Sequence, residues 1–127
     1  MAAAAVAKSI ETLDETAIES MYDNEVRAAL DVLQQGRANG ETRFIFVIPP
    51  MHEMGASGYA ASCAAAEGVR VLALSAARQW MAEGVTVNCI AALADDDIAP
   101  LVDFLSRDAG AGVSGETIRV GGPPMGL

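Results

Sequence analysis

A few side chains in this 127-residue sequence are of types that perform chemistry. Tyr59 could act as a proton donor, and Cys63 could act as a nucleophile if the single histidine, His52, activated it. A free cysteine in an apolar helix is more often a small hydrophobic residue, so a packing role is favoured for Cys63. His52 and Glu53 are adjacent metal-ligand types, but further ligands for a metal site are missing, and we expect them on a loop surface.

Three consecutive aspartates, Asp95, Asp96 and Asp97, form a second concentration of functional groups. Carboxylates at the start of a helix interact favourably with the helix dipole, so we interpret this run as a helix cap rather than as a cation site. Gly121 and Gly122 are not followed by a helix-forming sequence, which argues against a phosphate-binding loop.

The charge balance limits the classes of partner. With 17 acidic and 8 basic residues the formal net charge is −9, and no cluster of basic residues is present. This composition argues against nucleic-acid binding and against binding to anionic membranes. Cys63 and Cys89 lack the spacing of a metal-binding pair, and their apolar surroundings favour a reduced, cytoplasmic protein.

The longest apolar stretch covers residues 59–81. It is interrupted by Glu67, Arg70 and Arg78, and each of these charges is unfavourable inside a bilayer. The stretch therefore predicts a helix of a soluble protein rather than a membrane span.

The elements that must position these side chains alternate between helix and strand. Thr12 and Glu15 form a capping-box pattern, which predicts a helix that continues to a stop at Gly36. Strands buried on both faces are predicted from continuous apolar runs at residues 43–48 and 85–90, a third strand at 116–120, and helices at 59–81 and after Asp97. This order predicts a parallel α/β sheet in a single domain, residues 1–127, of which 1–11 are loosely ordered.

The helix predicted at residues 59–81 is apolar on nearly every side, so it must be covered on more than one side. One side can pack on the sheet, but a chain of this size has little left to cover the other. Association with another subunit is therefore predicted. The predicted interface residues come from this helix and from the first long helix: Val26, Leu30, Leu33, Ala66, Val69, Leu72, Ala73 and Trp80.

From about residue 13 onward, the order of elements resembles the C-terminal half of the short-chain dehydrogenase/reductase family. Residues 43–49 resemble the family's fifth strand, 84–90 its sixth, and 104–108 with 114–122 its closing helix and seventh strand. Tyr59 lies where the family has the tyrosine of its Tyr-x-x-x-Lys motif. The resemblance implies a truncated Rossmann-like parallel sheet of about three strands, with long helices packed for oligomerisation.

The sequence departs from the family at the residues that the resemblance makes catalytic. Cys63 stands at the position of the motif's lysine and carries no positive charge. The family's catalytic serine aligns with Pro49, which has no hydroxyl group, and Ser57 is a nearby substitute on the following loop. The family's asparagine aligns with Asn24 or Glu25.

The family's glycine-rich dinucleotide fingerprint is also not found. No glycine precedes Gly36, and nothing before Arg43 is predicted to be a strand. Backbone amides at a helix start must approach the pyrophosphate closely, which is why those glycines are needed. We therefore expect no cofactor in this chain and NAD or NADP in a partner.

These departures predict a catalytically inactive chain in which Tyr59, Cys63 and Pro49 are degenerate remnants, with no metal site. Its function would be to associate with and stabilise a full-length catalytic member of the family, in a heterotetramer with hydroxyacyl-CoA or alcohol dehydrogenase activity. In the alternative, the chain is half of a split NAD(P)-dependent dehydrogenase, completed by a separate N-terminal chain and using Tyr59. A small-ligand-binding domain is disfavoured because the loop at residues 91–94 is short.

An edge strand is a further consequence of the missing first half. Without preceding strands, residues 43–48 lie at the edge of the sheet, and proteins cover or pair such edges to avoid aggregation. The N-terminal segment could provide that cover.

Overall fold

A computed structural model describes residues 7–51 and 55–121. The predictions for His52, Glu53 and Gly122 fall outside these described residues. Ala7 and Lys8 lie within them, and the Lys8 backbone N–H donates a hydrogen bond to the Gly58 carbonyl at 2.8 Å.

Three parallel strands form one open sheet in the order β1, β2, β3. Their bounds are β1 (Arg43–Ile48), β2 (Thr86–Ala91) and β3 (Thr117–Arg119). The register pairs Arg43 with Thr86 and Ile48 with Ala91, and every residue of the central strand β2 is buried. The predicted α/β class with a truncated Rossmann-like parallel sheet is thereby confirmed.

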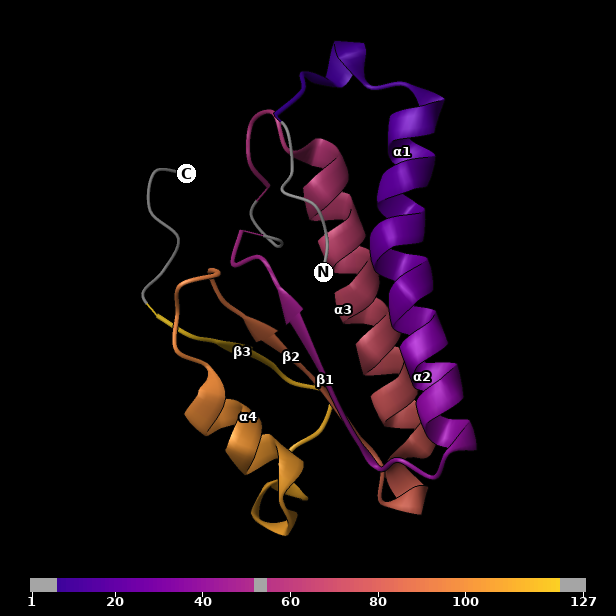
Figure 1. Ribbon diagram of the computed structural model, residues 1–127, viewed down its shortest axis with the longest axis vertical. Coiled ribbons are helices and arrows are strands. Elements are labelled where there is room, and N and C mark those ends of the chain that lie inside the picture. The colour runs from indigo at the N-terminus through magenta and orange to yellow at the C-terminus, as the bar shows by residue number, and fades with distance from the viewer. Residues whose placement is uncertain (1–6, 52–54, 122–127) are drawn as a thin grey trace.

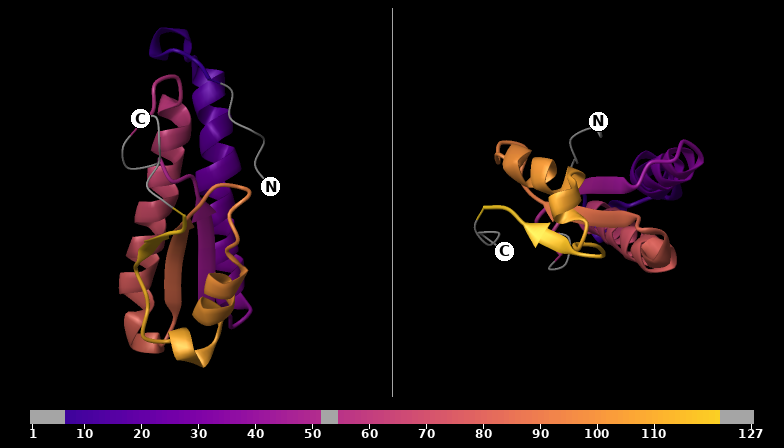
Figure 2. Two further views of the ribbon diagram at one scale, coloured as in Figure 1. Left: turned by 90° about the vertical axis from the view of Figure 1, so that its left-hand side faces the viewer. Right: turned by 90° about the horizontal axis from the view of Figure 1, so that it is seen from below.

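Helices lie on both faces of this sheet. The helical elements are, in chain order, η1 (Ile10–Thr12), α1 (Glu15–Met21), the π-helical segment η2 (Tyr22–Arg27), α2 (Ala28–Ala38), α3 (Ala60–Trp80), η3 (Met81–Glu83), α4 (Ala99–Ser106) and η4 (Asp108–Gly110). α1, η2 and α2 run on as one rod that lies alongside α3 (Figure 1). α4 lies on the other side of the sheet, as the end-on view in Figure 2 shows.

Alternation along the strands divides the core into two layers. Phe44, Ile48, Val87 and Cys89 point toward α3 and are buried with its inner side chains. Ile90, one residue further along β2, points the opposite way and packs with Leu105 of α4. Because successive strand residues point to opposite faces, a continuously apolar strand can support a helix on each side.

The start of the first helix differs from the predicted capping box. Thr12 belongs to η1, where its hydroxyl donates to the Ser9 carbonyl at 3.0 Å. Asp14 caps α1 instead, because its carboxylate accepts the Ala17 backbone N–H at 2.8 Å. A carboxylate at this position satisfies a free amide as well as the helix dipole, so the capping-box prediction at Thr12 is wrong.

Gly36 does not end the helix as predicted. α2 continues to Ala38, and Gly36 is a buried residue inside its last turns. A Cβ atom at this position would collide with the ring of Phe44 in β1. The glycine is therefore required by the close approach of α2 to β1, and the turn that follows uses Gly40, with φ of 80°.

The aspartate run caps α4 only in part. α4 begins at Ala99, and of the three aspartates only Asp97 binds its first turn, accepting the Ala99 N–H at 3.1 Å. Asp96 instead accepts the Leu93 N–H at 2.8 Å and closes the loop that follows β2. The interpretation of all three residues as one helix cap is corrected accordingly.

The predicted interface residues mostly face the chain's own core. Leu33, Ala66, Val69 and Ala73 are between 2% and 5% exposed, and they pack against the sheet and against one another. The partly buried Val26, Leu72 and Trp80 pack against the same cluster, and Leu30 is half-buried. The apolar residues of these helices therefore pack within this chain, because the α1–α2 rod provides the second cover that α3 needs.

By length and composition, the helical stretch Ala60–Glu83 could cross a membrane. The core helix of a soluble protein passes the same test, and α3 packs one side on the sheet and another on the rod. An ion pair on α3, Arg70 with Glu67 at 2.8 Å, is only about one-third exposed. α3 contributes its buried side to the core cluster of the chain.

Candidate functional site

The predicted remnant residues lie on the segments where β1 ends and α3 begins. In open parallel sheets ligands bind at the carboxyl end of the strands, because the crossover connections begin there. β1 ends at Ile48 and is followed by Pro49, and α3 returns from the same end. The Cys63 thiol donates a weak hydrogen bond to the Met51 carbonyl oxygen, 3.8 Å away, which ties the first turn of α3 to the end of β1.

Tyr59 occupies the N-cap position of α3. Its backbone N–H donates to the Ala56 carbonyl, and its carbonyl accepts from the Cys63 N–H, both at 2.9 Å. The backbone of Tyr59 is thus fixed at the helix start, and its side chain is half-buried. Within the part of the chain that the structure describes, no hydrogen bond to its hydroxyl group is present.

Cys63, Pro49 and Ser57 have different surroundings. Cys63 is buried against the core, whereas Ser57 is exposed on the loop before α3. Pro49 is exposed directly after β1. The structure therefore places Tyr59 and Cys63 on one helical turn and leaves Pro49 on the side of β1, where no hydroxyl group replaces the one that it lacks.

Arg119 crosses the carboxyl end of the sheet. From β3 its guanidinium Nη1 donates to the Pro50 carbonyl at 2.9 Å, spanning the central strand β2. This arginine was not predicted to lie near the site. A charged residue at the end of a short strand was the available signal, but its partner lies 69 positions earlier in the chain.

A groove, here called the edge groove, runs along the outer side of β1 under the helical rod. It encloses about 390 Å³. Its walls are apolar apart from three polar residues, and they comprise Met21, Asn24, Glu25, Ala28, Ala29, Val32, Phe46, Val47, Ile48, Pro49, Ser62, Ala66 and Val69. Polar Asn24 and Glu25 come from η2, and Ser62 comes from α3.

The backbone of β1 is unpaired on the side of the edge groove. The carbonyls of Thr42 and Ile48 accept hydrogen bonds from β2 and the residue after it, at 2.9 and 3.0 Å. In a parallel ladder, alternate residues direct both their N–H and C=O groups to one neighbour, so Ile45 and Val47 direct theirs away from β2. Among the described residues no strand pairs with this side of β1.

Glu25 is the ionisable residue of the edge groove. It is half-buried, and burial raises the pKa of its carboxyl group from the ordinary value of 4.5. It lies in η2, and π-helical segments are found frequently at functional sites. The signal in the sequence was a charged residue between Met21 and Ala28 on a stripe that is otherwise apolar.

A second groove, here called the helix groove, lies between the rod and the start of α3. Its lining is almost entirely apolar: Leu13, Ile18, Met21, Tyr22, Val26, Ala60, Ala61, Ala64, Ala65 and Gly68. Gly68 allows the close approach of the two helices, since a Cβ there would be 3.0 Å from the Val26 Cγ2. Ile18 is 53% exposed and Tyr22 is 49% exposed beside this groove.

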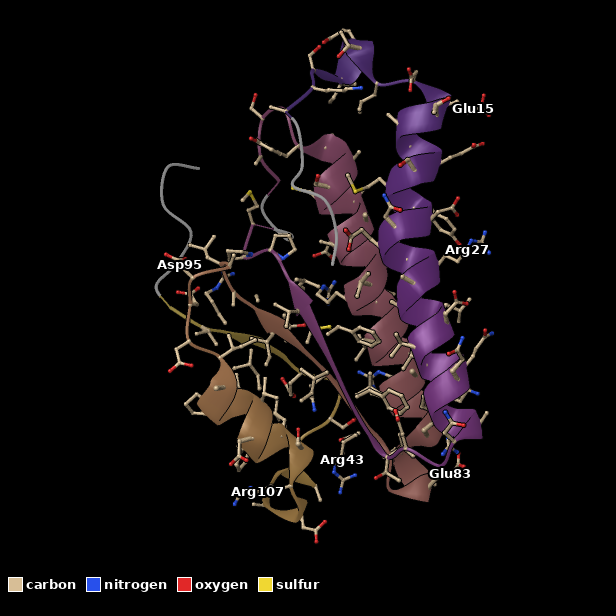
Figure 3. The ribbon with its side chains drawn as sticks, viewed as in Figure 1. Glu15, Arg27, Arg43, Glu83, Asp95 and Arg107 are labelled. Carbon is tan, nitrogen blue, oxygen red and sulfur yellow. The ribbon has the colours of Figure 1, made fainter. Side chains whose placement is uncertain are left out.

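The charged outer side of the rod faces away from both α3 and the sheet. Figure 3 shows Glu15 and Arg27 on this side, with Arg27 paired to Asp23 at 2.9 Å. Arg37 near the end of α2 contacts Glu83 and lies over the ring of Trp80, 5.0 Å from its centroid. The two contacts of Arg37 join the end of α2 to the end of α3 and to η3.

The described residues support neither a nucleophilic role for Cys89 nor a metal site. Cys89 is 1% exposed, and burial raises the pKa of its thiol to about 11, so it is a poor nucleophile. No group of three or more His, Cys, Asp or Glu residues within the described ranges could hold a metal ion.

Comparison with solved structures identifies the fold in a known enzyme. A structure titled "Promiscuous Reductase LugOII Catalyzes Keto-reduction at C1 during Lugdunomycin Biosynthesis" matches with a TM-score of 0.76 and 20% sequence identity. The match covers 86% of this chain and 50% of the reductase, so the chain spans about half of that protein's length. No family model and no curated protein match the chain.

This likeness corrects one prediction. The chain was expected to be a catalytically inactive subunit, but a protein that shares its fold is a reductase. The prediction of an inactive chain is therefore wrong, because the functional information that the comparison gives is that of a reductase.

Proposed function

We propose that the chain is the C-terminal part of an NAD(P)-dependent reductase that resembles the short-chain dehydrogenase/reductase family. Its activity requires polypeptide beyond these 127 residues to complete the sheet. The observation that carries the proposal is the coverage of the match: most of this chain superimposes on only half of a reductase, and β1 has a free edge.

A dinucleotide does not fit the described residues alone. The glycine nearest to a helix start is Gly58, just before α3. Lys8 donates to its carbonyl, and a Cβ on Gly58 would be 3.3 Å from the Ala7 Cβ, so the N-terminal residues cover this position. The phosphates of NAD or NADP must then be bound by the other part of the reductase.

Tyr59 is the residue of this chain that we assign to the chemistry. Its hydroxyl oxygen carries a proton that can be donated to the oxygen of a carbonyl substrate. It lies at the N-cap of α3, on the connection that follows the carboxyl end of β1, and ligands of open parallel sheets bind outside such ends. The buried Cys63 packs under this turn and has no assigned step.

The experiment is purification of the chain from its native source with an affinity tag after Leu127, followed by mass spectrometry and a reductase assay. We expect a companion polypeptide with a glycine-rich dinucleotide-binding sequence, and ketone-dependent oxidation of NADPH or NADH by the complex. A chain that stays alone, with no turnover and no cofactor binding, would contradict the proposal.

A second candidate function is association with a complete reductase through the helix groove. It is favoured by the half-exposed Ile18 and Tyr22 beside an apolar groove, a combination typical of protein-binding surfaces. Here the companion would have its own tyrosine and lysine, and an Ile18→Asp substitution would release it. The first proposal instead requires a companion that lacks a Tyr-x-x-x-Lys helix of its own.

A further inference from the structure

We infer that Arg119 of β3 is a positioning residue for Tyr59, on which it acts by holding the main chain between the end of β1 and the start of α3. The assignment rests on the proposed function, because it gives Tyr59 a part in the chemistry. The hold on the main chain can be measured in the isolated chain without any catalytic assay.

Arg119 reaches the end of β1 from the opposite edge of the sheet. The register aligns Arg119 with Ala91 of β2, and Ala91 with Ile48 of β1, so these residues form one row across the three strands. Side chains in one row of a parallel sheet point to the same face, and Ile48 and Ala91 belong to the core cluster shared with α3. The guanidinium therefore extends along the α3 face, past β2, and donates to the Pro50 carbonyl at 2.9 Å.

The small side chain of Ala91 leaves a path for this guanidinium. Neighbouring strands lie about 4.8 Å apart, so the Arg119 side chain must pass over one whole strand to reach the residues that follow β1. Ala91 is 1% exposed, and its methyl group is all that it places on the α3 face of β2. Ala91→Leu would fill the same space, and it would block the contact without changing any charge.

The contact with Arg119 satisfies a buried carbonyl group. Pro50 is buried, and a hydrogen bond from a charged donor is about twice as strong as one between neutral groups. A buried carbonyl that loses such a donor must find another partner, which requires the segment to move or to admit water. Loss of the guanidinium should therefore displace the main chain at the end of β1.

The carbonyl group of the next residue is held from α3. The Met51 oxygen accepts a weak hydrogen bond from the Cys63 thiol at 3.8 Å and a second from the Gly55 N–H at 3.2 Å. Two successive carbonyl groups, those of Pro50 and Met51, are thus held by side chains of different elements. The main chain that leaves β1 is tied to β3 on one side and to the first turn of α3 on the other.

Backbone hydrogen bonds connect this segment to Tyr59. The Ala56 carbonyl accepts the Tyr59 N–H, and the Tyr59 carbonyl accepts the Cys63 N–H, both at 2.9 Å. Gly55 and Gly58 have φ of 72° and 83°, a left-handed conformation that suits glycine, and a Cβ on Gly55 would meet no atom within 4 Å. The turns before Tyr59 have few side-chain contacts of their own, so the position of Tyr59 depends in part on the hold at the end of β1.

Amide hydrogen exchange in the isolated chain tests the hold on the main chain. Arg119→Met should speed the exchange of the Gly55, Tyr59 and Cys63 amides by about tenfold or more, because their acceptors lie on the displaced segment or follow it. The Thr86 amide, which is bonded at the other end of the sheet, should be unaffected. Unchanged exchange of the first three amides in a folded Arg119→Met chain would overturn the inference.

Two further variants control this measurement. Arg107→Met removes an exposed arginine that pairs with Asp103 on α4, and it should leave the exchange of all four amides unchanged. Ala91→Leu should speed the same three amides as Arg119→Met does, and it provides the test if Arg119→Met does not fold. Equal acceleration by Arg107→Met would show a general effect of charge and would count against the assignment.

A double-substitution cycle in the native complex separates positioning from a general loss of structure. Arg119→Met should lower kcat by about tenfold or more with little change in KM, because the displaced group is the proton donor. In a Tyr59→Phe background the same substitution should have no further effect, since no proton donor remains to be positioned. Effects that multiply in the double variant would show that Arg119 acts elsewhere, and would overturn its link to Tyr59.

The inference and the proposed function can fail separately. If Tyr59→Phe leaves kcat unchanged, the proposed role of Tyr59 fails, while the exchange measurement still decides whether Arg119 holds the main chain. If Tyr59→Phe lowers kcat and Arg119→Met does not, the proposed function stands and the inference fails.

Discussion

The packing of β1 against the helical rod can be tested by substituting Gly36 with alanine. Gly36 is a buried residue in α2, directly above the ring of Phe44. A Cβ atom at this position would collide with that ring and would lie 2.8 Å from a carboxylate oxygen of Glu41. The ring cannot simply move away, because Phe44 is 4% exposed and packs on Trp80 with a centroid distance of 5.9 Å.

Two opposing terms determine the magnitude. Replacing glycine by alanine inside a helix is favourable by about 1 kcal/mol, because alanine loses less backbone entropy on folding. Inserting a methyl group into a packed core is unfavourable by about 1–3 kcal/mol, and the depth of this overlap places Gly36→Ala at the upper end. We expect a net loss of about 1–2 kcal/mol in the free energy of unfolding.

Urea denaturation followed by circular dichroism measures this change. Gly112→Ala is the matched control, since nothing lies within 4 Å of the added Cβ, and its stability should change by no more than about 0.5 kcal/mol. Phe44→Leu should make the Gly36→Ala substitution less unfavourable, because the ring is the obstacle. A Gly36→Ala protein as stable as the parent chain would refute the described packing of α2 on β1.

Three other outcomes are expected. Tyr59→Phe should lower kcat of the native complex by about a hundredfold or more with little change in stability, and an unchanged kcat in a steady-state assay would remove Tyr59 from the chemistry. Cys89, whose thiol pKa is raised to about 11 by burial, should resist iodoacetamide at neutral pH until the protein is unfolded, and rapid labelling of the folded protein, located by peptide mapping, would contradict its burial. Glu25→Gln should make the free energy of unfolding of the isolated chain depend less on pH. Burial raises the Glu25 pKa above 4.5, so protonation of this carboxyl group favours the folded state. The stability that Glu25 contributes is complete below pH 4.5 and is lost as the pH rises through the raised pKa. Urea titrations across that interval should show the loss in the parent chain and not in Glu25→Gln, with Glu19→Gln as the control.

The strands were predictable because they have a local signature. Residues 43–48 were predicted and observed as β1, since a continuous run of apolar residues ends at a proline pair. β2 was predicted one residue early, at 85–90 rather than at Thr86–Ala91. Burial on both faces was predicted for both runs and holds only for β2, whereas in β1 Val47 is 54% exposed because β1 has a neighbouring strand on one side only among the described residues.

The features set by tertiary contacts were not predictable in the same way. Gly36 has the sequence signature of a helix stop, but the ring of Phe44, eight positions later, decides its role. Leu33 and Val69 were predicted at an interface because an apolar helix must be covered, and the pattern alone does not say whether the cover comes from the same chain.

The residues of the candidate site also divide into those with a local sequence signature and those set by tertiary contacts. Tyr59 was found from its position at the start of a long helix, and the structure places it at the N-cap of α3. The edge position of β1 was predicted and is confirmed among the described residues, but the edge groove was not predicted, because its walls come from three elements, the rod, β1 and α3. Glu25 was named only through its alignment with the family's asparagine.

Amide hydrogen exchange along β1 tests the central claim, that a strand from outside these residues completes the sheet, most directly. In the isolated chain the amides of Ile45 and Val47 should exchange quickly, while those of Phe44 and Phe46, which face β2, should be protected. In the native reductase complex all four should be protected. Rapid exchange of Ile45 and Val47 in an active complex would contradict the account.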